Sequence, residues 1–286
     1  GGGSGNSSTK IYSAIAGGFN NAIAGDNCFI GGGTQNQANE ADGFIGGGTS
    51  NVLDGSLCAI GGGTLNQASS YACTVAGGYN NQTSGDYSTI GGGYNNQTTG
   101  IYAVVAGGHA CHAVDPYCAV IGGTTNIAQG TYAITAGGYF NNTDGDGAAC
   151  FGGQQNLTQA DWAACIGGSS NYAGANKSVV VGGQLNQSLG EDSFIGGGSN
   201  NMAGGLSVGI LGSDNNIDGD YSFAVGRSCS TTEDYTVTLG RSASAIHTGA
   251  HVYKDGTASA VQSTAANQLT LSYEGGIRLL FPTSQR

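Results

Sequence analysis

The pattern of hydrophobic and polar residues repeats every 15 residues along most of this chain. A pair of glycines begins at Gly17, and further pairs follow at the same spacing as far as Gly212, where serine takes the second place. Two shorter steps of 14 residues then lead to Gly226 and Gly240. A fixed period of this kind is typical of solenoid proteins, in which each repeat forms one coil that stacks on its neighbours and buries a continuous core.

An apolar column lies two residues before each glycine pair. Eleven of its fourteen members are Ile or Val, such as Ile30 and Val105, and these residue types pack well on a pleated strand. Small residues such as Cys28 stand two places earlier and so share the same strand face. The column between them, which contains Phe29 and Phe44, is largely apolar as well. We therefore expect one strand in each copy that is apolar, and buried, on both faces.

An asparagine column follows four residues after the first glycine of each pair. Stacked coils place identical side chains about 4.8 Å apart, so a buried asparagine column predicts a hydrogen-bond ladder along the stack. A second strand with one exposed face follows, and a further glycine such as Gly85 then turns the chain back. The predicted ladder consists of Asn21, Asn36, Asn51, Asn66, Asn81, Asn96, Asn126, Asn141, Asn156, Asn171, Asn186, Asn201 and Asn216.

Each copy is therefore one coil of a parallel β-solenoid, and the fold class is all-β. A coil this short is too thin to have a large interior, and its outward apolar column would form a stripe along the stack. Association of identical chains is the simplest way to bury a stripe that every copy carries. A parallel homotrimer fits this requirement best, although the pattern itself leaves the number of chains open.

The columns also predict how the chain is divided. We expect a flexible leader over 1–10, a β-roll of fourteen 15-residue coils over 11–212, and two 14-residue coils over 213–248. A terminating strand element or neck is expected over 249–286. The chain opens on glycine rather than Met, from which we expect a processed product or a fragment.

The repeats resemble a known family. The copy Gly85-Asp86-Tyr87-Ser88-Thr89-Ile90-Gly91-Gly92-Gly93-Tyr94-Asn95-Asn96-Gln97-Thr98 and the segment Tyr221-Ser222-Phe223-Ala224-Val225-Gly226-Arg227 resemble the head repeats of trimeric autotransporter adhesins of the YadA type. The same repeat occurs in phage and predator fibre proteins. The resemblance covers roughly residues 11–281 and implies a left-handed β-roll of three intertwined chains, displayed on a cell or virion surface. The period of this chain is one residue longer than the period usual in these adhesins.

The charge balance excludes several classes of partner. Eighteen acidic residues outnumber seven lysines and arginines, giving a formal net charge of −11. Nucleic acids and anionic membrane surfaces are bound by clusters of lysine and arginine, so neither is expected as a partner. Membrane insertion is not expected either, because no apolar run approaches the roughly 18–20 residues of a membrane helix.

No group of side chains in the sequence predicts catalysis or a cofactor. His109, Cys111 and His112 form the cluster most similar to a set of metal ligands, but their spacing matches no zinc signature. We therefore expect no enzyme activity, no cofactor and no bound metal.

Four cysteines stand at equivalent positions of consecutive copies, as the pairs Cys58 with Cys73 and Cys150 with Cys165. The distance between stacked Cα atoms permits a disulfide, but parallel side chains do not aim their sulfur atoms at each other. Cysteine also behaves as a small buried hydrophobic residue. Free buried thiols and at least one disulfide both remain compatible with the pattern.

Aromatic residues supply the candidate binding surface. Tyr79, Tyr94, His109 and Tyr139 share one column just after the glycine pair. Trp162 belongs to a second column before the apolar strand, together with Tyr12, Tyr87, Tyr102, Tyr117 and Tyr132. Exposed aromatic side chains stack on sugar rings or anchor protein partners, and the alternative is that they only shield the corners. We take Tyr79, Tyr94, His109, Tyr139 and Trp162 as the candidate ligand-binding surface.

Two functions fit these expectations. The first is an extracellular trimeric fibre head or adhesin, on a cell or virion surface, that recognises a host or prey cell-surface glycan or protein. The second is a structural subunit of an extracellular filament or sheath that polymerises through its coils. Neither function involves catalysis.

Overall fold

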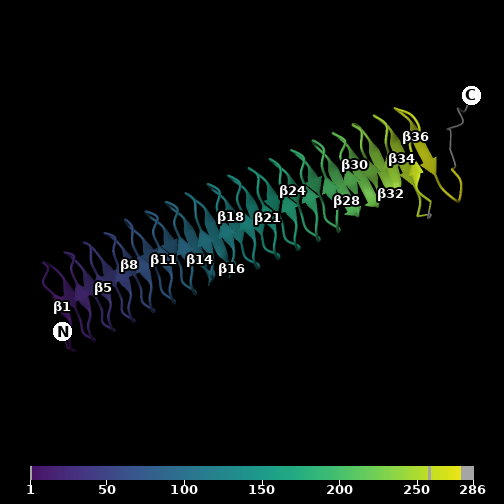
Figure 1. Ribbon diagram of the computed structural model, residues 1–286. Coiled ribbons are helices and arrows are strands. Elements are labelled where there is room, and N and C mark those ends of the chain that lie inside the picture. The colour runs from purple at the N-terminus through teal and green to yellow at the C-terminus, as the bar shows by residue number, and fades with distance from the viewer. Residues whose placement is uncertain (1, 257–258, 278–286) are drawn as a thin grey trace, which may run out of the picture. The chain divides into compact units, whose positions relative to one another are not determined.

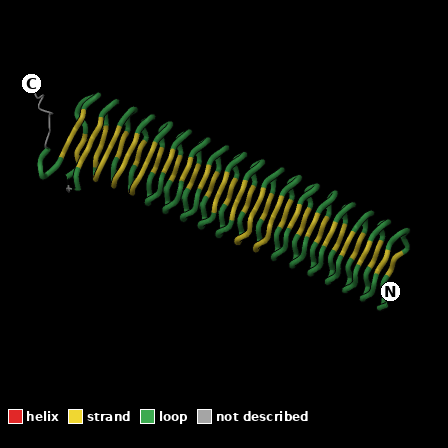
Figure 2. Tube along the Cα trace, turned by 180° about the vertical axis from the view of Figure 1, so that it is seen from behind, coloured by secondary structure: helices red, strands yellow, loops and turns green. Residues whose placement is uncertain are grey.

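The computed structural model describes residues 2–256 and 259–277 of the chain, which forms a parallel β-solenoid of about 18 coils with a 15-residue repeat. Two compact units are distinguished, unit 1 over Gly1–Gly168 and unit 2 over Ser169–Arg286. Within each unit the coils follow one another in chain order (Figure 1). The described residues contain strands, turns and bends but no helix (Figure 2). The predicted all-β solenoid with 15-residue coils is confirmed.

Every coil contributes one short strand to each of two parallel sheets, here named sheet A and sheet B. Sheet A of unit 1 contains β2 (Ala14–Ile15), β4 (Phe29–Ile30), β6 (Phe44–Ile45), β8 (Ala59–Ile60), β10 (Thr74–Val75), β12 (Thr89–Ile90), β14 (Val104–His109), β16 (Ala119–Thr124), β18 (Ile134–Ala136), β20 (Ala149–Phe151) and β22 (Ala164–Cys165). Sheet B of unit 1 contains β1 (Ser7–Ser8), β3 (Ala22–Ile23), β5 (Gln37–Ala38), β7 (Val52–Leu53), β9 (Gln67–Ala68), β11 (Gln82–Thr83), β13 (Gln97–Thr98), β15 (His112–Ala113), β17 (Ile127–Ala128), β19 (Asn142–Thr143) and β21 (Leu157–Thr158).

Unit 2 has the same two sheets. Its sheet A contains β24 (Val179–Val180), β26 (Phe194–Ile195), β28 (Gly209–Ser213), β30 (Phe223–Arg227), β32 (Val237–Arg241), β34 (His251–Lys254) and β36 (Leu269–Ser272). Its sheet B contains β23 (Tyr172–Ala173), β25 (Gln187–Ser188), β27 (Met202–Ala203), β29 (Asn216–Ile217), β31 (Ser230–Thr231), β33 (Ala243–Ala245) and β35 (Val261–Gln262).

The register between neighbouring coils explains why the sequence columns exist. Strands of unit 1 pair in one constant register, as Ile30 pairs with Ile45 in β4 and β6, apart from a local shift where Gly107 pairs with Ile121. Backbone N–H groups of one coil donate to carbonyls of the next, for example from Phe44 to Cys58 at 3.0 Å. Equivalent side chains therefore lie directly over one another, and the residue type that suits one coil suits its neighbour.

The core of each coil is narrow and lies between the two sheets. The column of Ile30 and Val105 is fully buried, with the small residue Cys28 beside it and Ala38 of sheet B opposite. The intervening side chains point outward, so Phe29 is 41% exposed. Within one chain, sheet A therefore buries only one of the two faces that the sequence predicted to be buried.

Two corners in most coils use left-handed backbone at residues other than glycine. Asn95 (φ 57°) and Tyr87 (φ 57°) represent these two columns. The backbone N–H of Asn95 donates to Tyr79 O at 2.9 Å, and that of Tyr87 donates to Tyr71 O at 2.8 Å. Hydrogen bonds to the preceding coil thus hold a conformation that a side chain alone disfavours.

The longer coils carry an extra glycine at the corner after sheet A, here named the glycine corner. Three glycines separate Ile195 from Ser199, whereas only Leu211 and Gly212 separate Ile210 from Ser213. Without the extra residue, β28 and β30 pair continuously from Gly209 to Ser213. The same shorter step continues from β30 to β32 and from β32 to β34.

Two details of the sequence-based division and one predicted ladder residue are wrong. There are three of the shorter steps instead of two, because Lys254 follows Gly240 at the glycine position of the third step. The 1–10 segment is not a separate leader, because β1 pairs in parallel with β3 and forms part of a coil. Asn216 is exposed and points outward from β29, and Asn215 takes its place in the ladder, because the shortened corner moves the register by one residue. The end of the expected terminating element, residues 278–286, lies outside the described residues.

Candidate functional site

The buried asparagines satisfy the backbone of the glycine corner. Asn36 donates from Nδ2 to Gly32 O at 2.9 Å in its own coil and to Gly48 O at 3.0 Å in the next. Its Oδ1 accepts the backbone N–H of Asn51 at 3.1 Å. Asn36 therefore bonds its own coil, through the carbonyl of the extra glycine Gly32, and the coil that follows.

The other predicted ladder members are placed in the same way. All of them except Asn216 are buried: Asn21, Asn36, Asn51, Asn66, Asn81, Asn96, Asn126, Asn141, Asn156, Asn171, Asn186 and Asn201. Asn6 also belongs to the ladder, because its Oδ1 accepts the backbone N–H of Asn21 at 3.0 Å. Its sequence signal is Gly2-Gly3, one full step before Gly17. The ladder is a structural element that leaves few polar atoms for a ligand.

The cysteines of the sequence analysis are buried thiols in the structure, Cys58 and Cys73 in one column and Cys150 and Cys165 in another. The thiol of Cys58 donates to Ser70 O at 2.8 Å, and that of Cys73 donates to Gly85 O at 3.2 Å. Burial raises the pKa of Cys150 to about 12, so this thiol is protonated and weakly nucleophilic at neutral pH.

The cluster around Cys111 does not converge. Cys111 is buried at a ladder position, His109 stacks on Tyr94, and His112 lies in the outward column of β15. Burial lowers the pKa of His112, which favours its neutral form. Among the described residues no three metal-ligating side chains lie close enough to hold an ion. The described part of the chain also contains no helix long and apolar enough to cross a membrane.

Three of the predicted aromatic residues form one stack, here named the first stack. The rings of Tyr79 and Tyr94 lie 5.0 Å apart and nearly parallel, and His109 continues the stack at 5.1 Å. Tyr139 occupies the same column but is separated from His109 by Thr124, and its ring contacts Phe140 instead. Trp162 lies on the other corner of the coil. The five candidate residues therefore do not form one continuous surface.

A longer aromatic stack lies on the turn between sheet B and sheet A and was not among the candidate binding residues. This second stack consists of Tyr71, Tyr87, Tyr102, Tyr117 and Tyr132, with centroid distances of 4.9–5.5 Å between neighbours. The pKa of Tyr87 is raised, because its surroundings desolvate the hydroxyl and adjacent tyrosines disfavour its charged form. The tyrosine column from Tyr87 to Tyr132 was the signal available in the sequence.

The stacked arrangement limits what these rings can bind. The planes of Tyr87, Tyr102 and Tyr117 lie within 8–11° of parallel, so each ring covers the faces of its neighbours. Sugars and other partners that stack on aromatic rings need an open face. Inside both stacks only ring edges and hydroxyl groups remain exposed, so the stacks chiefly stabilise the corners.

Aspartates on the turn between sheet B and sheet A also link coils. The carboxylate of Asp86 accepts the backbone N–H of Tyr71 at 3.0 Å and a hydrogen bond from the Ser70 hydroxyl. These bonds hold the pKa of Asp86 below its ordinary value. Asp146 accepts the N–H of Thr131 in the same way, at 2.8 Å.

The outward side of sheet A in unit 1 is uncharged along its whole length and apolar except at Thr74 and Thr89, and we name it the apolar outer face. A large side chain, where a coil has one, lies in either column: Phe44 stands beside Gly46, and Phe151 stands beside Ala149. Phe29 stacks on Phe44 with centroids 5.9 Å apart. The face contains no charged residue and consists of Ala14, Phe29, Phe44, Ala59, Thr74, Thr89, Val104, Ala119, Ile134, Ala149 and Ala164, and of Ala16, Gly31, Gly46, Gly61, Ala76, Gly91, Ala106, Ile121, Ala136, Phe151 and Ile166.

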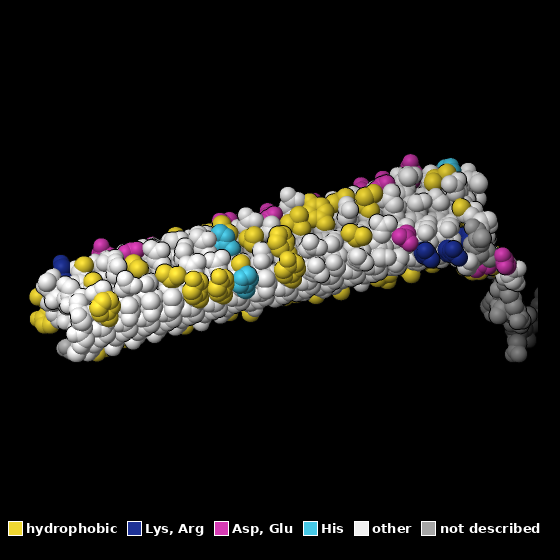
Figure 3. Space-filling view, turned by 60° about the horizontal axis from the view of Figure 1, so that its bottom comes forward, with side chains coloured by type: hydrophobic (Ala, Val, Ile, Leu, Met, Phe, Trp, Pro, Cys, Tyr) yellow, Lys and Arg dark blue, Asp and Glu magenta, His cyan; other side chains and the backbone are white. Residues whose placement is uncertain are grey.

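The space-filling view in Figure 3 shows short rows of hydrophobic side chains beside histidines, which the apolar outer face does not contain. Several members of the apolar outer face are large and substantially exposed, with Ile121 at 58% and Phe151 at 47%. A contiguous exposed surface of this kind, on a chain with little charge, is typical of an interface. It is the strongest candidate functional surface in unit 1.

A comparison with protein-family models gives no match, and neither does a comparison with curated proteins.

Proposed function

We propose that the protein is a module of a homo-oligomeric extracellular fibre that recognises a glycan or protein on a host or prey cell. Its apolar outer face is buried between copies of the chain, and its corners and sheet B remain outside as the recognition surface. Three parallel copies, displayed on a cell or virion surface, are the arrangement that the resemblance to adhesin heads implies. The observation that carries the proposal is the uncharged, exposed face of sheet A.

Physical reasons favour identical chains as the partner. Every coil of unit 1 presents the same two outward columns, so a second copy in parallel register meets an equivalent surface at each coil. Burying the exposed half of one phenylalanine contributes about 1 kcal/mol, and many coils add their contributions. Cyclic association of parallel copies about an axis along the stack buries this face on every copy and gives a defined oligomer.

The structural-filament function remains the second candidate, and the aromatic stacks favour it. Their ring faces are covered by neighbouring rings, as at Tyr102 between Tyr87 and Tyr117. Aromatic groups that contact each other support durability of the coils more than capture of a ligand. Electron microscopy of the purified chain separates the two functions, because an adhesin head gives discrete particles and a filament subunit gives continuous fibres.

The oligomer is tested by measuring mass in solution by sedimentation for the wild type, Phe44→Glu and Gln82→Glu. Both substitutions place a carboxylate on an outward strand position, but only Phe44 lies on the apolar outer face. We expect a trimer for the wild type and Gln82→Glu, and dissociation for Phe44→Glu with an unchanged circular dichroism spectrum. A monomeric wild type at micromolar concentration would contradict the proposal.

A further inference from the structure

A hollow of about 250 Å³ lies in unit 2 where the coil becomes one residue shorter. Three successive coils line it: Leu185 and Gln187 from the first, Asn200 and Met202 from the second, and Asp214 and Asn216 from the third. Leu185, Asn200 and Asp214 occupy one left-handed corner column, while Gln187, Met202 and Asn216 point outward from sheet B. The hollow therefore runs between the corner and sheet B.

The hollow lies where one glycine of the corner is lost between the coil of Gly198 and the coil of Gly212. A Cβ built on Gly198 would lie 1.6 Å from Gly212 O, whereas the equivalent distance from Gly33 to Gly48 O is 2.1 Å. Asn201 Nδ2 likewise lies only 2.6 Å from Gly212 O. The shortened corner thus approaches the preceding coil more closely, and the hollow lies at this change of coil length.

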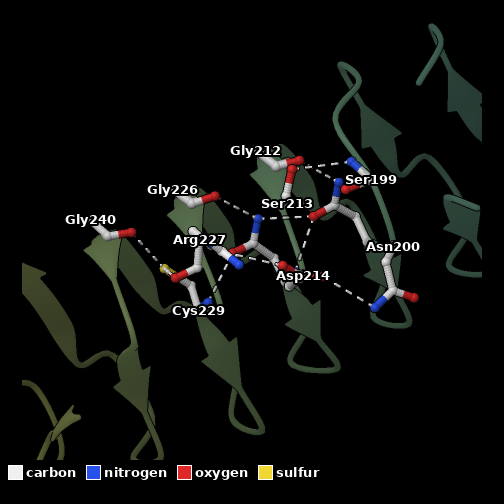
Figure 4. Close-up of polar contacts among 11 residues, drawn as sticks. Ser199, Asn200, Gly212, Ser213, Asp214, Gly226, Arg227, Cys229 and Gly240 are labelled. Carbon is white, nitrogen blue, oxygen red and sulfur yellow. Dashed lines mark hydrogen bonds and ion pairs between the residues drawn. The ribbon is translucent and has the colours of Figure 1, made fainter. Parts of the chain in front are cut away.

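Polar groups converge on the hollow from different coils. Asn200 Nδ2 lies 3.4 Å from Asp214 Oδ1, and the guanidinium of Arg227 lies 3.4 Å from Asp214 Oδ2 (Figure 4). Both bonds are long, so these side chains can turn to a ligand with little loss. The amides of Gln187 and Asn216 supply further donors and acceptors at the rim, and Leu185 presents an apolar surface that is 50% exposed.

We propose that this hollow binds one neutral sugar ring of a glycan. A sugar presents hydroxyl groups that both donate and accept, which fits a carboxylate beside several amides. It also presents an apolar ring face, which fits Leu185 and Met202. The volume lies below the roughly 300–1,000 Å³ of sites for drug-sized ligands, so one ring fits better than an oligosaccharide.

Other ligand classes fit less well. Asp214 already faces Arg227, and the described residues hold no cluster of metal-ligating side chains, which argues against a cation. One exposed guanidinium next to a carboxylate is a poor anion site. A sugar site specifies which class of ligand the proposed recognition surface binds, so this proposal rests on the proposed function. The hollow is lined by residues of the corner and of sheet B, and no residue of sheet A lines it.

The chain contains its own control for this site. The tripeptide Leu65-Asn66-Gln67 is identical to Leu185-Asn186-Gln187, and both leucines have left-handed backbone at the same corner. Leu65, however, lies between coils that keep the longer step. Comparing Leu185→Ala with Leu65→Ala therefore separates the effect of the hollow from the effect of removing an exposed leucine.

The experiment titrates the full chain with glucose, galactose, mannose, N-acetylglucosamine and N-acetylgalactosamine, observed by saturation-transfer NMR. We expect saturable binding of at least one sugar in the millimolar range. Leu185→Ala and Asp214→Asn should each weaken it by about tenfold, with Leu65→Ala unchanged. Inserting a glycine between Leu211 and Gly212 restores the longer coil, alters none of the side chains named above, and should abolish binding.

The outcomes separate this proposal from the proposed oligomer. No saturable binding of any of the five sugars would overturn the sugar site, as would equal losses for Leu185→Ala and Leu65→Ala. Circular dichroism on each variant shows whether it is folded, and sedimentation on the same samples gives the oligomeric state. A monomer that still binds a sugar through Leu185 supports the hollow while refuting the fibre module.

Discussion

Removing one asparagine from the ladder should destabilise the coils around it far more than removing its exposed neighbour. In Asn36→Ala, the backbone N–H of Asn51 loses its acceptor inside the core, and the carbonyls of Gly32 and Gly48 lose their donors. An orphaned buried N–H costs roughly 1–3 kcal/mol, and each lost bond to a partly buried carbonyl costs about 1 kcal/mol. The expected loss is therefore about 3–5 kcal/mol.

The matched control is Gln37→Ala, whose side chain is exposed on β5 and whose substitution should cost less than about 0.5 kcal/mol. Equilibrium urea unfolding gives the overall change, and hydrogen exchange at Asn51 reports the local one. Because about 1.4 kcal/mol corresponds to a factor of ten, the Asn51 amide should exchange at least about a hundredfold faster in Asn36→Ala. Equal effects of the two variants would show that the ladder does not stabilise the solenoid.

Three further predictions concern the corners. Gly63→Ala should prevent stable folding of its coil, because φ is 92° and the new Cβ would lie 2.1 Å from a backbone oxygen; Gly62→Ala, which meets nothing closer than 3.9 Å, should be tolerated in thermal unfolding. The lowered pKa of Asp86 implies stability that is present above the ordinary value of 3.8 and lost as pH falls through the lower folded value. Asp86→Asn should therefore flatten the acid limb of a stability profile, and an unchanged limb would refute this. Tyr102→Ala removes two ring contacts and should cost about 1–3 kcal/mol in urea unfolding, whereas Tyr12→Ala, at 89% exposure, should cost almost nothing.

The repeating columns made most of the fold predictable. A constant parallel register between coils places each side chain above its equivalent, so buried and exposed positions could be assigned by type, as at Ile30 and Asn36. The sequence Asn215-Asn216 shows where this reasoning ends. Either asparagine can continue the column, and only the pairing of β27 with β29 shows which coil has lost a residue.

The candidate site was less predictable, because it depends on orientation and on irregularity. Spacing placed Tyr79 above Tyr94, but the nearly parallel rings that cover each other's faces are a matter of side-chain rotamers. The hollow beside Leu185 has no signal in residue type, since the same tripeptide occurs at Leu65 without a change of coil length. Both features result from how neighbouring coils fit together.

The constant register that prevails in unit 1 also bears on how such a chain changes over generations. Its first coils all pair at the same step, so duplicating or deleting one of them reproduces the hydrogen bonds and the side-chain columns on both sides of the junction. A gene encoding this array can therefore change the length of its product in steps of one coil without any compensating substitution. Deleting one glycine codon at a glycine corner has a different effect, since it shortens one coil relative to the coil before it, and near Gly212 a hollow lies where the two coil lengths meet.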